Sequence, residues 1–181
     1  MNGNPNAESI EIRVDQIAQL FHSLDPFPFN ERDLDADAEE HIVGWARELP
    51  RDRPLEIRIH LPATEAASPA ARDLGTSIAR YFAYRADMLG RELKELFRVG
   101  RISLLIGVGV LGVCLGVGQA ITGLFGPSFL GHFIEQGLII VGWVANWRPI
   151  AIFLYDWWPL ARRRRLYQRL AAAAVIVKPT G

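Results

Sequence analysis

The feature that most constrains this fold is the stretch 102–134, which contains no Asp, Glu, Lys or Arg. Its first part, 102–125, is 24 residues long. The hydrocarbon core of a bilayer is about 30 Å thick and needs about 20 helical residues, so this part is long enough to cross with some tilt. Helices buried in soluble proteins are rarely apolar on every face. The sequence therefore predicts a transmembrane helix over 102–125.

A second predicted span begins at Phe129, after the helix-breaking segment 126–128. It can end at Trp147 or at Trp158. A span of 137–158 places Arg148 at the bilayer centre, which costs roughly 2.5–3.5 kcal/mol. We favour the span 129–147, because it leaves Arg148 in the interface, where its guanidinium can reach the headgroups.

Aromatic and basic residues after this span suit the membrane interface, where they act as anchors. Residues 148–160 are predicted to form an amphipathic interfacial helix, followed by a basic cytoplasmic tail over 161–181. The predicted interface anchors are Trp143, Trp147, Arg148, Trp157 and Trp158.

Basic residues flank the hairpin on both sides, and none lies between 102 and 147. The positive-inside rule then places both chain ends in the cytoplasm and makes the protein multi-pass. Eighteen of the 20 basic residues are Arg, a habit of GC-rich bacteria, so we expect a bacterial inner membrane. The run Arg162, Arg163, Arg164 and Arg165 is interpreted as a contact with anionic lipid headgroups rather than with nucleic acid.

Small residues follow one face of the first span, and such faces let membrane helices approach closely. This predicted packing face consists of Gly109, Gly112, Gly116, Ala120 and Gly123. Its partner is open: the second span, another copy or a different protein. If Pro127 is the apex of the hairpin, Gln119 and Glu135 lie at equal depth, which predicts an intramembrane polar pair. The alternative is that Glu135 is a hydrated carboxylate in the outer interface.

Residues 1–62 are predicted to form a small cytoplasmic α+β domain with the order β-α-α-β. Alternating apolar residues indicate strands over 8–14 and 54–61, with two helical patterns between them. Two helices return the chain antiparallel, and that pairing places Glu11 opposite Arg58. Ala38, Ile42, Trp45 and Leu49 are predicted to form the inner stripe of the second of these helices.

A long helix is predicted over 63–101, which leads into the membrane and covers the small sheet; strand addition from a partner is the alternative cover. Residues 1–75 carry 15 acidic and 7 basic side chains, so this domain is predicted to be acidic. The loop residues Phe27 and Phe29 are its predicted partner surface.

No catalytic motif, metal-ligand spacing or cofactor motif is present in the sequence, and the one cysteine excludes a disulfide scaffold. We therefore expect a non-enzymatic accessory or adaptor protein, without cofactor or metal, in a homo- or hetero-oligomeric membrane complex. The alternative is a homo-oligomeric pore or small transport component that uses Glu135.

Overall fold

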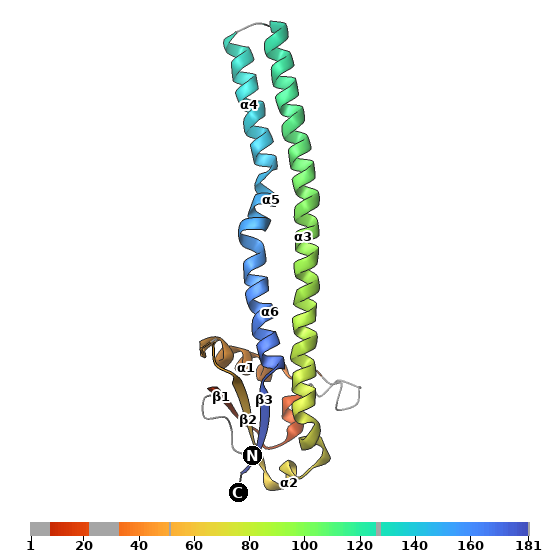
Figure 1. Cartoon of the computed structure of the whole chain (residues 1–181), viewed down its shortest axis with the longest axis vertical. Coiled ribbons are helices and arrows are strands. Elements are labelled where there is room, and N and C mark those ends of the chain that lie inside the picture. The colour runs from red at the N-terminus through yellow and green to blue at the C-terminus, as the bar shows by residue number, and fades with distance from the viewer. Residues whose placement is uncertain (1–7, 22–32, 51, 126–127, 181) are drawn as a thin grey trace. The chain divides into compact units, whose positions relative to one another are not determined.

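The structure is a computed structural model, and it describes residues 8–21, 33–50, 52–125 and 128–180. The chain forms two compact units: unit 1 is 1–89 with 162–181, and unit 2 is 90–161. The helices and strands, labelled in Figure 1, are β1 (Glu8–Arg13), η1 (Ile17–Leu20), α1 (Ala36–Glu48), β2 (Leu55–Pro62), α2 (Ala63–Ala66), α3 (Pro69–Phe125), α4 (Phe129–Ala145), α5 (Trp147–Ala151), η3 (Ile152–Asp156), α6 (Trp157–Ala171) and β3 (Ala174–Thr180).

Unit 1 is built on a three-stranded parallel sheet with the strand order β1-β2-β3. The predicted antiparallel β-α-α-β domain is therefore wrong. The first of its two helices is only the short 3₁₀ turn η1, so α1 is the one α-helix that the described chain places between β1 and β2. A single helical crossover brings the chain back in the same direction, as in a βαβ unit.

The charges on the two strands do not require antiparallel pairing. A parallel register that opposes Glu11 to Glu56 places like charges together. In the structure the strands are offset by two residues from it, and Glu11 faces Arg58 with 3.6 Å between Oε1 and Nη1. Parallel pairing thus satisfies the same charges, and Arg58 also donates from Nε to Glu56 at 2.6 Å.

The C-terminal segment 161–181, interpreted from sequence as a tail, contains the end of α6 and the strand β3. β3 pairs with β2, so the chain itself supplies a strand to the sheet, for which strand addition from a partner was the alternative cover. The sequence signal was the β-branched run Val175, Ile176, Val177, which is typical of strands.

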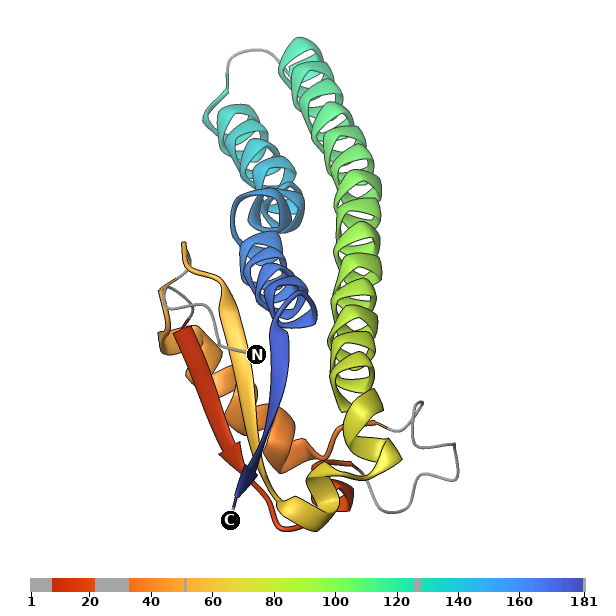
Figure 2. The same cartoon turned by 60° about the horizontal axis from the view of Figure 1, so that its bottom comes forward.

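The helices of unit 1 cover one face of the sheet, and α1 lies against that face in Figure 2. The buried core of unit 1 contains the sheet residues Ile10, Ile57 and Ile59 and residues of α3. Leu74, Ile78 and Phe82 of α3 are fully buried, and the helix continues without a break through Gly100. Trp45 does not belong to the inner stripe of α1, since 51% of its surface is exposed; Ile42, Val43 and Ala46 form that stripe.

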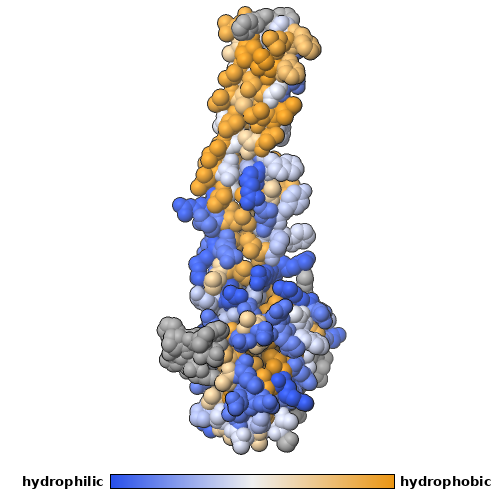
Figure 3. Space-filling view, turned by 180° about the vertical axis from the view of Figure 1, so that it is seen from behind, coloured by the Kyte–Doolittle hydropathy of each residue, from blue (hydrophilic) through white to orange (hydrophobic). Residues whose placement is uncertain are grey.

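Two helical runs in the described chain are long and apolar enough to cross a membrane: α3, and the nearly continuous run from Phe129 to Ala171. Few residues in their apolar windows are buried, whereas the core helix of a soluble protein is mostly buried. Within unit 2, apolar side chains cover the loop end of the hairpin and hydrophilic ones appear further along its helices (Figure 3). With 57 residues, α3 is about 85 Å long, so it contributes to both units.

Candidate functional site

The helices of unit 2 approach closely at glycines. A Cβ placed on Gly107 would lie 2.7 Å from Oδ1 of Asn146 and 3.0 Å from the carbonyl oxygen of Ala145. A Cβ on Gly142 would lie 2.6 Å from Cδ1 of Leu111. Because a real Cβ never lies that close to its neighbours, both positions require glycine for this packing.

Asn146 is the buried polar link between these helices. Only 6% of its surface is exposed, and its side-chain amide donates to the carbonyl oxygens of Gly107 at 3.0 Å and Gly142 at 2.9 Å. A buried amide in an apolar setting is costly unless it is bonded, and here both donors are used. Asn146 therefore connects α3 to α4 in one register.

The predicted packing face lies on the other side of α3. At about 100° per residue, Gly109, Gly112 and Gly116 are opposite Gly107 and Leu111. A Cβ placed on Gly109, Gly112, Gly116 or Gly123 would meet nothing within 4 Å, and Ala120 is exposed. We call these five residues the open glycine face. The hairpin thus packs through Gly100, Gly107, Gly118 and Gly142 and leaves the open glycine face without a partner in the described chain.

The structure places Glu135 against Gly118, with 3.3 Å from Cγ to a Cβ built on that glycine. Gln119, the next residue, is exposed, and no hydrogen bond joins its side chain to Glu135 among the described residues. The register is one residue away from the one predicted with Pro127 as the apex. One residue turns a helix by about 100°, which directs Gln119 away from Glu135.

The predicted interface anchors are mostly exposed. Trp143, Trp147 and Trp158 present most of their surface, whereas Trp157 is half-buried. The Arg148 guanidinium reaches Asp156 at 2.8 Å, two helical turns further along the chain.

The predicted lipid-contact run belongs to α6 in unit 1. Arg163 lies over the ring of Tyr167, with 5.8 Å from Cζ to the ring centroid. Nε of Arg164 is buried without a hydrogen-bond partner among the described groups, and Arg162 and Arg165 are exposed. Phe27 and Phe29, the predicted partner surface, lie outside the described residues.

A polar cluster in unit 1, not identified from the sequence, gathers around the carboxylate of Glu39 on α1. Tyr81 of α3 donates to Oε2 at 2.6 Å, and Tyr167 of α6 donates to Oε1 at 2.5 Å. Arg85 of α3 donates from Nη2 to both oxygens, at 3.0 and 3.1 Å. One carboxylate therefore joins three helices that are far apart in sequence.

The cluster shifts the pKa values of its members. Burial alone raises the pKa of Glu39, but hydrogen bonds from Tyr167, Tyr81 and Arg85 and the charge of Arg85 lower it below its ordinary value of 4.5. Burial and the bond to Glu39 raise the pKa of Tyr81. Burial lowers the pKa of Arg85, but Glu39 raises it overall. At neutral pH the cluster is an ionised Glu39–Arg85 pair, to which Tyr81 donates as a neutral phenol.

The fold of unit 1 also changes the predicted charge balance. Folding residues 162–181 onto residues 1–89 adds Arg and Lys, so unit 1 carries 16 acidic and 15 basic side chains. The acidic domain predicted for the N-terminal part is therefore nearly neutral as a folded unit.

No group of three or more His, Cys, Asp or Glu side chains is placed to hold a metal ion in the described parts of the chain. No protein-family model, curated protein or solved structure matches this sequence.

Proposed function

We propose that this chain is a non-enzymatic subunit of a membrane complex, which packs against another membrane helix through the open glycine face. The observation that carries the proposal is that the hairpin's internal contact uses one side of α3 while Gly112 and Gly116 stay open on the other. Glycine inside a helix costs about 1 kcal/mol relative to alanine. Between membrane helices the close packing of backbones offsets that cost. Larger apolar side chains would gain nothing from leaving lipid, because lipid is as apolar as they are.

The proposed location is a bacterial inner membrane with both chain ends in the cytoplasm, supported by the basic flanks of the hairpin. The contact between Gly100 and Ile152 supports a second span that ends near Ile152, beyond the end at Trp147 that the sequence favours, because residue 152 is then level with Arg101. In this arrangement Arg148 starts inside the apolar layer and reaches Asp156 in the interface, as a snorkelling arginine does.

Unit 1 is proposed to be the part of the complex that binds a cytoplasmic partner. Its two outer strands, β1 and β3, each pair with β2 on one side only in the described sheet. Parallel strand edges of this kind are sites where an added strand can pair. Because unit 1 is nearly neutral, it has no strong net charge that would attract a basic partner. Its charge balance therefore favours recognition by shape and by backbone pairing.

The test is native mass spectrometry of the tagged full chain, extracted gently from its own membrane at natural abundance. We expect the chain in a fixed ratio with a second membrane protein or with copies of itself. The double variant Gly112→Ile/Gly116→Ile should release that partner, because branched side chains block close approach. The control Val110→Ile/Val117→Ile changes lipid-exposed positions at the same depth and should keep the partner.

A wild-type chain that stays monomeric contradicts the proposal. A complex that survives Gly112→Ile/Gly116→Ile as well as the control also contradicts it. A closed homo-oligomer without a companion protein is compatible with both the packing proposal and the pore alternative. Conductance of Glu135→Gln against wild type then decides between a pore and a structural oligomer.

A further inference from the structure

We propose that the basic groove of unit 2 binds an anionic phospholipid, whose phosphate lies between Arg98 and Arg101. The groove has a volume of about 650 Å³ and is open to one side. We define it by four cations and two rings: Arg91, Lys94, Arg98, Arg101, Phe97 and Phe153. The proposal relies on the membrane insertion proposed above but not on the open glycine face.

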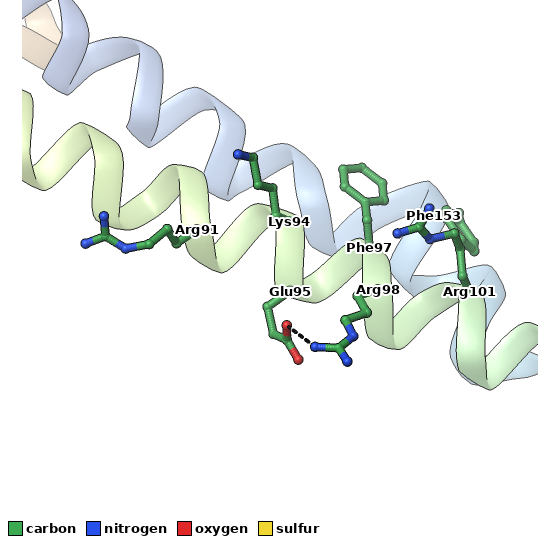
Figure 4. Close-up of a pocket in the computed structure, with 7 residues that line it drawn as sticks. All are labelled: Arg91, Lys94, Glu95, Phe97, Arg98, Arg101 and Phe153. Atoms are coloured by element: carbon green, nitrogen blue, oxygen red, sulfur yellow. Dashed lines mark ion pairs between the residues drawn. The ribbon is translucent and has the colours of Figure 1, made fainter.

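The charges of the groove are largely uncompensated. Its four cations all belong to α3 and are exposed; in Figure 4, Lys94 extends on the side of Phe97 and Arg98 on the side of Glu95. Glu95 is 3.8 Å from Arg98, but both side chains are mostly exposed, at 63% and 68%. Such an exposed pair contributes little, so a lipid phosphate can take the place of Glu95 beside Arg98. The other three cations have no carboxylate within 4.0 Å among the described residues.

The aromatic wall of the groove is held in place before any lipid binds. The ring of Phe97 stacks on Phe153 with 6.0 Å between centroids, and it meets Trp157 at 6.2 Å. Trp157 donates from its indole nitrogen to the carbonyl oxygen of Phe153 at 2.8 Å. Phe153 belongs to the π-helical segment η3, and such segments occur frequently at functional sites.

The depth of the groove matches the headgroup layer. Ile102 begins the uncharged stretch, so Arg101 lies at the edge of the hydrocarbon and Arg98 about 4.5 Å beyond it. The polar layer on each side of a bilayer is roughly 5–8 Å thick. Arg98 and Arg101 are therefore level with lipid phosphates, and the rings of Phe97 and Phe153 lie in the same layer. Arg91, about 15 Å from Arg101, lies beyond this layer.

This depth distinguishes an inner from an outer cation pair. Arg98 and Arg101 contact the phosphate, whereas Arg91 and Lys94 act only through the surface potential, which salt screens. Each basic residue near an anionic surface contributes about a fivefold preference. Loss of the inner pair should therefore reduce the preference about 25-fold, and loss of the outer pair should have a smaller effect that salt removes.

The test uses the full chain, reconstituted in vesicles with phosphatidylcholine in excess over phosphatidylglycerol. The ratio of the two lipids retained after gentle extraction is counted by native mass spectrometry. We expect wild type to retain phosphatidylglycerol preferentially and Arg98→Gln/Arg101→Gln to lose that preference. The control Arg47→Gln/Arg72→Gln removes the same charge from exposed positions of unit 1 and should keep it. Millimolar inorganic phosphate should not displace the lipid.

Three results overturn the proposal: an unchanged ratio in Arg98→Gln/Arg101→Gln, a loss of preference confined to Arg162→Gln/Arg165→Gln, or equal displacement by inorganic phosphate. Flotation of each variant with pure phosphatidylcholine vesicles shows whether the hairpin still inserts. Gly112→Ile/Gly116→Ile should retain the lipid even if it loses its protein partner. The failure of one proposal is therefore visible separately from the failure of the other.

Discussion

The Glu39 cluster makes a sharp prediction about how the C-terminal segment is held in unit 1. Glu39 is well buried, with 15% of its side chain exposed, and it accepts hydrogen bonds from Tyr81, Tyr167 and Arg85. Glu39→Gln preserves the shape of the side chain but removes its charge. The perturbation therefore tests the charge-assisted bonds and not the packing.

The size of the effect follows from the contacts. A hydrogen bond to a charged group contributes about 1.5–3 kcal/mol and a neutral one about 0.5–1.5 kcal/mol, so each tyrosine bond loses about 1 kcal/mol in Glu39→Gln. Arg85 is 35% exposed, so the loss of its partner adds less than a buried pair would. We expect a total of about 2 kcal/mol for Glu39→Gln and, from the lower end of the charged range, about 1.5 kcal/mol for Tyr167→Phe.

The assay is hydrogen exchange of the full chain in nonionic detergent micelles, read at β3. Because Tyr167 lies on the helix that leads into β3, opening of the cluster releases that strand from β2. We expect β3 amides to exchange about thirtyfold faster in Glu39→Gln and about tenfold faster in Tyr167→Phe. The control Glu40→Gln changes the same charge at the adjacent exposed position and should stay near wild type. Exchange in Glu39→Gln within twofold of Glu40→Gln would refute the reasoning.

Further predictions concern acidity and the hairpin. The folded-state pKa of Glu39 lies below 4.5, so the ionised carboxylate stabilises unit 1 fully above that pH. This stabilisation is lost as the pH falls through the lowered pKa. Thermal unfolding should show the loss in wild type and not in Glu39→Gln. Gly107→Ala should destabilise the hairpin by about 1–3 kcal/mol in SDS titrations, because its Cβ meets Asn146, whereas Gly109→Ala should not. Asn146→Leu should cost about 0.6–1.7 kcal/mol in the same titration, and an unchanged midpoint would contradict the role of its two hydrogen bonds.

The candidate sites were predictable only in part. The small residues from Gly109 to Gly123 were recognisable because helical period is a local property of sequence. Which side of α3 meets α4 was not, since glycines occur on both sides and the choice depends on Asn146 reaching Gly107. The Glu39 cluster was not predictable either, because Tyr81 and Tyr167 approach Glu39 only after folding.

The sequence by itself determined the length and apolar character of the two membrane-spanning candidates, the continuity of α3 through Gly100 and the absence of charge from 102 to 134. Tertiary structure decided the direction of β1 and β2, the presence of β3 in their sheet and the one-residue register of the hairpin. The physical reason is the size of the competing energies. Removing an uncharged stretch of this length from water involves many kcal/mol, whereas cross-strand pairs such as Glu11 and Arg58 differ between registers by about 0.2–1 kcal/mol each.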